Sequence, residues 1–369
     1  MNSRVFGLDI GTTSIKCALV KKEGNVFSIE SIAVAPQTAK GIVSESLVDL
    51  EALADVIRKM LVSANLKTAN VAFSLPESQV YTKVIEMPLL SDQELSAALK
   101  FEMEQYIPLP LDQVKTDWVI LGKSESSDLP ALYRNGTGPA DQLRQSGGEA
   151  SEAGKKTMEV MIIAAPLSIV NKYEKLSEML NLRSESIESE VISVHRALLP
   201  LVNNTSSHMI LHIGSNISSI CIVKQGIIKT IVSMSLGGTV ITRAISIALG
   251  IDSAQAENYK RAYGLNQDAF EGKIGKALAP ILQSIVGDVK KTMLSFREKN
   301  ANEAISQVVL SGGSSLLPGI DAFFTNNLST QVVLGNCFAA YSMENVPQEL
   351  AIQAPSFNVV VGLALRNLL

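Results

Sequence analysis

Apolar residues in this chain gather in short runs separated by turn-forming residues, a pattern typical of β-strands. The first run ends at Asp9-Ile10, and a second run follows Gly11–Ser14 and continues through Val20. Two apolar runs joined by a short turn of small residues predict a β-hairpin. Further strands are expected at Val26–Ala35, Asn70–Leu75, Val80–Met87, Thr116–Leu121, Met158–Ala165 and Ser184–Ile187.

Other segments place their apolar residues at helical spacing. After Asp49, a stripe that includes Leu53, Ile57 and Met60 predicts a helix. Ser91 and Glu94 have the spacing of a capping box, and the helix that they open is expected to end at Tyr106, before two prolines. Further helices are expected at Leu167–Leu180, Glu190–Leu201, Val240–Leu249, after Asp252, at Leu317–Asn327, at Asn358–Leu368, and across Gln267–Asn300, where Gly272, Gly275 and Pro280 divide the helical region.

The second half of the chain repeats the opening pattern. Met209–Val223 predicts a second hairpin, and a shift of 203 positions places Ile10 on Ile213 and Gly11 on Gly214. A third strand at Ile227–Met234 follows it, as in the first half. Such internal recurrence indicates two halves of related fold that face each other across a cleft.

Composition narrows the class of protein. The 369 residues are 46% hydrophobic and 18% charged, and the net charge of −4 gives no general attraction to nucleic acid or to an anionic membrane. Three widely spaced cysteines predict neither a disulfide framework nor a metal cluster. No signal peptide and no apolar run of about 20 residues is evident, so a cytoplasmic location is expected. Residues 122–156 are rich in Gly, Ser, Glu and Lys and are expected to form a disordered loop, with a partner-binding loop as the alternative.

The first turn carries the first candidate chemistry. A turn of Gly, Thr and Ser exposes backbone N–H groups and hydroxyls that can hold phosphate oxygens. Asp9, at the end of the strand, suits a hydrated Mg²⁺, because hard cations prefer carboxylate and water oxygens. Lys16 could neutralise phosphate charge, or it could be an ordinary solvated lysine. The candidate phosphate-binding residues are therefore Gly11, Thr12, Thr13, Ser14 and Lys16.

Together these motifs resemble the actin-like ATPase superfamily. Asp9–Ser14 matches its first phosphate loop, His212–Asn216 the second, and Leu310–Ser314 the adenosine motif, where glycines let the backbone lie against the nucleoside. Glu257 and Lys260 match a pair that some members place near adenine and ribose. By resemblance, ATP and Mg²⁺ would be held by Asp9 and the first loop, by Gly214, Ser215 and Asn216, by Gly237 and Gly238, by Glu257 and Lys260, and by Gly312, Gly313 and Ser314.

The resemblance implies an α/β fold with two duplicated ribonuclease-H-like domains around a nucleotide cleft. The first half is expected over residues 1–204, with an inserted subdomain at about 88–165. The second half is expected over residues 205–369, with a helical insertion at about 250–304. The terminal helix at 357–369 could pack against the first half or form an amphipathic membrane tip. With Arg366 as its one cation, it favours packing.

A closer resemblance is to the PilM family of type IV pilus assembly proteins. It rests on Phe101–Pro110 with Asp117, on Glu188–Leu198, and on the motifs at 235–239, 256–260 and 361–366. The resemblance implies a cytoplasmic ATP-binding adaptor, peripheral to the inner membrane, whose first half grips the cytoplasmic N-terminal tail of a PilN-like membrane protein. The groove would be bordered by Glu102, Glu104, Tyr106 and Ile107, although Tyr106 and Ile107 could equally pack the subdomain core.

Whether ATP is hydrolysed is not decided by the sequence, because it departs at one position from the pattern of the actin-like ATPases. His212 stands where many relatives keep a second acidic residue, and a neutral imidazole does not replace that charge. Glu188 is the candidate for a general base, or alternatively a capping or surface glutamate. ATP binding with slow or absent hydrolysis is therefore expected. The alternatives are a filament-forming ATPase similar to FtsA and, with no aspartate base to support it, a small-molecule kinase.

Overall fold

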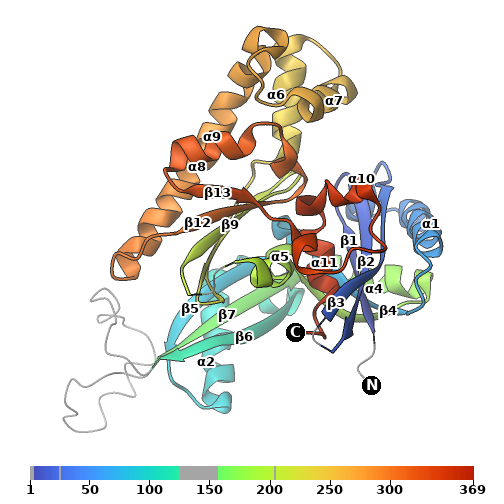
Figure 1. Ribbon diagram of the computed structural model, residues 1–369. Helices are drawn as coiled ribbons and strands as arrows, with labels where there is room; N and C mark the ends of the chain where they lie inside the picture. Colours follow the sequence, from blue (N-terminus) through green and yellow to red (C-terminus); the bar gives the residue numbers. More distant parts are fainter. Residues whose placement is uncertain (1–3, 25, 125–156, 203–204) are drawn as a thin grey trace.

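The computed structural model describes residues 4–24, 26–124, 157–202 and 205–369 (Figure 1). Its described residues form two five-stranded sheets and one three-stranded sheet. The first sheet has the strand order β3-β2-β1-β4-β8. Its strands are β1 (Val5–Ile10), β2 (Ser14–Glu23), β3 (Val26–Pro36), β4 (Asn70–Leu75) and β8 (Arg183–Ser189).

The second sheet repeats this order as β11-β10-β9-β12-β13. In the first hairpin the Gly11 N–H donates to the Ser14 carbonyl over 3.1 Å, and in the second the Gly214 N–H donates to the Ile217 carbonyl over 3.0 Å. The same turn therefore closes both hairpins, and the duplication predicted from the sequence is confirmed. The strands are β9 (His208–Ile213), β10 (Ser218–Lys224), β11 (Ile227–Met234), β12 (Gln307–Ser311) and β13 (Gln331–Leu334).

Helices cover both faces of the first sheet, which explains why every residue of β1 is buried. On one face lie α1 (Leu47–Ser63) and α4 (Leu167–Leu180), and α1 buries the predicted stripe of Leu53, Ile57 and Met60. On the other face lie α5 (Glu190–Leu198) and α11 (Asn358–Ala364). Two short 3-10 helices, Gly41–Val43 and Leu199–Leu201, flank these elements.

An inserted subdomain is built on the sheet β5-β7-β6. The predicted capping box is present at the start of its helix, where the backbone N–H of Ser91 donates to Glu94 over 2.9 Å. Strand β6 continues to Ser124, so the region expected to be a loop from residue 122 starts as a strand, and residues 125–156 lie outside the described part of the chain. The elements are β5 (Tyr81–Pro88), α2 (Asp92–Tyr106), β6 (Val114–Ser124) and β7 (Thr157–Pro166), with 3-10 turns η2 (Glu77–Gln79) and η3 (Leu111–Gln113).

The longest described helix, α8 (Lys273–Lys299), corrects one expectation. Pro280 and Gly275 were expected to divide it, but only Gly272, which precedes it as the N-cap, marks a boundary. A proline costs a backbone hydrogen bond, and the long buried face of α8 offsets that cost. The other elements of this half are α6 (Gly238–Leu249), α7 (Ser253–Tyr263), α9 (Ile320–Leu328), α10 (Gln348–Ala351) and 3-10 turns at 269–272, 313–316, 337–340 and 354–356.

Helix α11 returns to the first half and packs against β1, β2 and α5. It ends at Ala364 rather than at the expected Leu368. Two glycines allow the close approach: a Cβ on Gly7 would lie 2.3 Å from the Val360 carbonyl oxygen, and a Cβ on Gly362 would lie 1.8 Å from that of Ser193. Among the described helices, none has the length and apolar character needed to cross a bilayer.

Candidate functional site

The two hairpin turns meet between the halves of the molecule. The Thr13 and Ser215 hydroxyl oxygens are 3.5 Å apart, and the Asn216 amide donates to the Thr12 hydroxyl over 3.4 Å. In the described part of the chain, the backbone N–H groups of Thr12, Thr13, Ser215 and Asn216 have no hydrogen-bond acceptor. Four free donors at facing turns are the arrangement that binds phosphate oxygens.

Asp9 lies at the floor of this region. Its side chain is only 6% exposed, and the Ser74 hydroxyl donates to Oδ1 over 2.8 Å. Asp9 is paired across the hairpin with Lys16, whose ammonium donates to the Ser14 hydroxyl over 2.9 Å. The sheet therefore holds one carboxylate and one cation beside the first turn.

Glu190 is a second acidic residue at the same floor, and sequence reasoning missed it. It is the first residue of α5, and its carboxylate accepts a hydrogen bond from the Glu77 backbone N–H. Burial, together with the negative charges of Asp9 and Glu77, raises the pKa of Glu190 well above its usual range, although Lys16 opposes the shift. A carboxyl group with a raised pKa beside a predicted Mg²⁺ site fits a general base.

Glu188, the predicted general base, has a different environment. Arg196 donates to both of its carboxylate oxygens over 2.7 and 2.9 Å, and Arg366 donates to Oε2 over 2.9 Å. Arg196 also donates to the Gly362 carbonyl over 2.8 Å. Both oxygens of Glu188 thus take part in ion pairs that tie β8 to α5 and to the segment after α11. This arrangement favours a structural role for Glu188 and leaves Glu190 as the better candidate.

His212 occupies the Asp9-equivalent place on β9. Its Nδ1 lies 3.0 Å from the Ser311 hydroxyl, which also accepts a hydrogen bond from the Asn358 amide over 2.9 Å. Burial, and secondarily the positive charge of Lys16, lowers the pKa of His212 to about 4. The ring is therefore neutral at pH 7, and it is a packed, hydrogen-bonded histidine.

The remaining predicted residues form one wall on the second half. Lys260 pairs with Glu257 over 2.6 Å and donates to the Gly238 carbonyl over 3.3 Å, and the Gly238 N–H donates to the Gly214 carbonyl over 2.9 Å. Burial opposes ionisation of Glu257, yet hydrogen bonds from Lys260 and Thr242 hold its pKa below the usual range. Glu257 is therefore held in its ionised form, in contact with Lys260 beside the second turn.

Glycines let the segments of this wall pack closely and leave open space at one position. A Cβ on Gly238 would lie 2.4 Å from the Ser314 hydroxyl, and Ser314 itself donates to the Gly214 carbonyl over 3.1 Å. Gly312 has φ +89° and lies against the Ile213 carbonyl, whereas a Cβ on Gly313 would meet no atom within 4 Å. Gly237 lies equally close to Ser215. Gly313 thus faces open space beside the turns, as a nucleoside platform requires.

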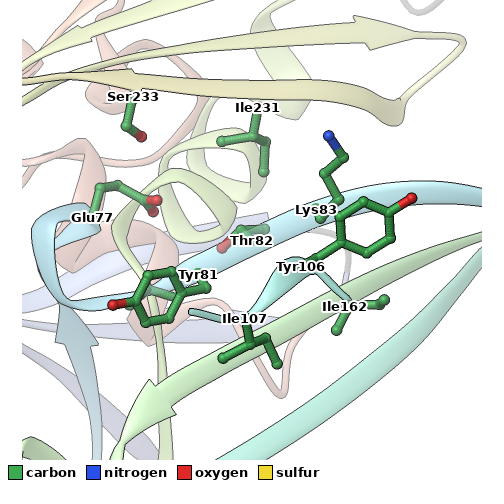
Figure 2. Close-up of a pocket in the computed structure, with 10 residues that line it drawn as sticks. Glu77, Tyr81, Thr82, Lys83, Tyr106, Ile107, Ile162, Ile231 and Ser233 are labelled. Carbon is green, nitrogen blue, oxygen red and sulfur yellow. The ribbon is translucent and has the colours of Figure 1, made fainter. Parts of the chain in front are cut away.

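The predicted partner-binding residues are only partly brought together. Tyr106 and Ile107 line a pocket of about 270 Å³, whereas Glu102 and Glu104 are outside its lining. Figure 2 shows Tyr81, Thr82 and Lys83 of β5 on one side of this pocket and Ile231 and Ser233 of β11 on the other. The Lys83 ammonium lies 5.3 Å from the centre of the Tyr106 ring. The pocket therefore combines apolar walls with an aromatic ring and a cation.

Two sheets of the same strand order, with matching turns that meet between them, define an actin-like protein. A family model described as "Type IV pilus assembly protein PilM" matches residues 7–130 and 147–368. The chain belongs to the PilM family of type IV pilus assembly proteins.

Comparison with solved structures agrees on the fold. A structure described as a PilM-PilN type IV pilus biogenesis complex matches with a TM-score of 0.80 and 22% identity over 100% of both chains. The ethanolamine utilization protein EutJ from Carboxydothermus hydrogenoformans matches with a TM-score of 0.53 and 13% identity, over 98% of this chain and 88% of EutJ. A MamK double helical filament matches with a TM-score of 0.51 and 13% identity over 98% of both chains.

Proposed function

We propose that the protein is a cytoplasmic adaptor of the type IV pilus inner-membrane platform that binds ATP and Mg²⁺ and grips the cytoplasmic tail of a PilN-like membrane protein. The observation that carries the nucleotide site is the pair of facing turns with four free backbone donors. Membership of the PilM family supports the pilus platform. The PilM-PilN complex supports the partner, because its fold extends over the whole of this chain.

The residues divide into three roles around the nucleotide. The donors of Thr12, Thr13, Ser215 and Asn216 would hold the phosphate oxygens, with Lys16 neutralising part of their charge. Asp9, fixed by Ser74, would hold Mg²⁺ through water. Gly237, Gly238, Gly312, Gly313 and Ser314, with Glu257 and Lys260, would accommodate the nucleoside. Mg²⁺, when bound, would polarise the phosphate oxygens.

Hydrolysis should be slow in this arrangement. Glu190 would accept a proton from an attacking water, but the second half offers the neutral His212 instead of an acid at the place equivalent to Asp9. Without that acid, the cleft has one carboxylate fewer to orient a Mg²⁺-bound or attacking water. Nucleotide would therefore act mainly as a bound ligand that biases the position of the two halves.

Gly313→Leu gives a sharp test of the nucleotide site. A leucine there has room in the folded protein, because a Cβ meets no atom within 4 Å, but it fills the space predicted for the nucleoside. ATP affinity, measured by calorimetric titration with Mg²⁺, should fall at least tenfold. Gly287→Leu is the matched control, because Gly287 is also open and lies on the exposed face of α8, a helix that carries none of the predicted site residues. Equal ATP affinity for both variants and the wild type contradicts the site.

The tail-binding groove is tested at Tyr106. Truncation to alanine removes the aromatic wall and the partner of Lys83, so affinity for a synthetic PilN-tail peptide should fall about tenfold or more. Charge reversal at Glu102 and Glu104 together should change affinity less, because these residues do not line the pocket. If Tyr106→Ala binds the peptide as the wild type does while folding normally, this pocket is not the groove.

A further inference from the structure

Glu77 is shared between the pocket and the floor of the nucleotide site. It lies in the 3-10 turn η2, between β4 and β5, and is 6% exposed. Figure 2 shows Glu77 at one end of the pocket, opposite the end where Lys83 and Tyr106 lie. Tail binding by Tyr106 and Lys83 does not explain why a buried acid lies at the other end of the pocket.

The Glu77 carboxylate holds the start of α5. Its Oε1 accepts hydrogen bonds from the Ser189 hydroxyl and from the Val191 backbone N–H, the latter over 3.2 Å. Ser189 is the N-cap of α5, and Val191 is its second residue. Because the first N–H groups of a helix have no partner within the helix, an acceptor at this point fixes where the helix begins.

The contact is reciprocal. The backbone N–H of Glu77 donates to the carboxylate of Glu190, the first residue of the same helix. Turn η2 and the start of α5 therefore hold each other in the manner of a capping box, but from segments 112 positions apart in the chain. If either segment moves, these hydrogen bonds must break or the other segment must move with it.

The interlock, meaning the contacts of Glu77 with Ser189, Glu190 and Val191, connects the pocket with the nucleotide site. Val80, Tyr81, Thr82 and Lys83, which directly follow η2, line the pocket. Glu190 interacts electrostatically with Asp9 and Lys16, which flank the first phosphate turn. A ligand that shifts η2 from the pocket side thus changes the position of Glu190, and a ligand that repositions Glu190 changes the pocket.

We propose that Glu77 is a positioning residue that couples occupancy of the pocket to occupancy of the nucleotide site through the start of α5. The inference rests on the proposed function, since it takes the PilN-like tail and ATP as the two ligands. It adds the route by which one affects the other. By thermodynamic linkage, nucleotide changes tail affinity by the same factor by which tail changes nucleotide affinity.

The experiment measures this factor directly. A synthetic peptide with the cytoplasmic tail sequence of the PilN-like partner is titrated into the full-length chain with and without Mg²⁺ and a non-hydrolysable ATP analogue. For the wild type the two affinities should differ by about 5- to 150-fold, the usual range of coupling between sites. In Glu77→Ala the ratio should fall to within twofold of one, while peptide and nucleotide each still bind.

Two variants separate positioning from simple damage. Glu77→Gln keeps a side-chain oxygen for Ser189 and Val191, so it should restore most of the wild-type ratio. Ser78→Ala is the matched control, because Ser78 is the exposed neighbour in the same turn, and its ratio should equal that of the wild type. If Glu77→Ala does not fold, Ser189→Ala removes one donor of the interlock and should still reduce the ratio at least twofold.

The outcomes distinguish this inference from the proposed function. A wild-type ratio near one, with both ligands bound, overturns the coupling and leaves the adaptor intact. A wild-type ratio retained in folded Glu77→Ala, or in Ser189→Ala where the first variant does not fold, overturns the role of Glu77. Failure of the wild type to bind nucleotide or peptide at all overturns the proposed function and this inference with it.

Discussion

His212 shows how one residue changes the chemistry that a duplicated fold can perform. It occupies the place of Asp9 in the second half, and its hydrogen bond with Ser311 fits a neutral ring. The second half thus repeats the turn of the first half but carries a neutral ring where the first half carries a carboxylate. The likeness of the two turns could be predicted from the sequence, because backbone turns depend on local residues. The surroundings that keep His212 neutral could not, because its partner Ser311 comes from β12 and is itself hydrogen-bonded to Asn358, near the far end of the chain.

The lowered pKa of His212 predicts a pH dependence of stability. An unfolded histidine has a pKa of about 6.5, so between there and about pH 4 the unfolded chain binds more protons than the folded one. The free energy of unfolding must therefore fall as the pH falls through this window, by about 2 to 3 kcal/mol between pH 6.5 and 4.5 for this one residue.

Urea denaturation of the wild type and of His212→Gln at about pH 7 and 4.5 checks this prediction. The acidic groups with raised pKa, Glu77 and Glu190, act in the opposite direction but are common to both proteins. The difference between the two free energies of unfolding should therefore shift against the wild type at the lower pH. A difference that is the same at both pH values contradicts a neutral buried His212.

At the scale of elements, the boundary between β8 and α5 decides which glutamate belongs to the site. The sequence placed the end of the strand at Ile187, which made Glu188 the first residue after it. The strand in fact continues to Ser189, which is also the N-cap of α5. Glu188 therefore still belongs to the strand and meets Arg196, while Glu190 begins the helix beside Asp9. Apolar patterns locate elements well but define their ends only to within a few residues. Here that uncertainty decides whether Glu188 or Glu190 is the candidate general base.

Glu188→Gln and Glu190→Gln should consequently have opposite effects. The first leaves Arg196 and Arg366 facing a neutral amide and should lower the free energy of unfolding by about 3 kcal/mol, a moderate value for a buried pair because Arg366 is partly exposed. ATP affinity should not change. The second removes a carboxyl group whose ionised form is disfavoured by burial and by the charges of Asp9 and Glu77, so stability at pH 7 should stay equal or rise while any ATP turnover falls.

Denaturation curves and single-turnover hydrolysis on both variants give the comparison. Loss of turnover in Glu188→Gln, with wild-type stability, would return the catalytic role to Glu188.

At the scale of the whole molecule, the arrangement of the two sheets could be predicted because the chain repeats itself. Two hairpins with the same turn, each followed by a third strand, indicated two sheets around a cleft, and the glycine motifs indicated where a nucleotide would lie. The pocket could not be predicted in the same way, because β5 and β11 meet there from different halves. An ion pair between Glu159 of β7 and Lys229 of β11 also joins the inserted subdomain to the second half. Contacts of this kind leave no periodic signal in the sequence.

The return of α11 to β1 has a consequence for the order in which the protein can fold as it is made. The sheet of the first half is completed by β8, yet the face that carries α5 stays partly uncovered until residues 358–364 have been synthesised, because Gly7 and Gly362 place α11 directly against β1 and α5. At about 5 to 20 residues per second, the interval between Leu198 and Asn358 lasts on the order of ten to thirty seconds. During translation the nascent first half therefore presents an apolar sheet face that chaperones can recognise, and its nucleotide turn gains its final support only when the second half has emerged.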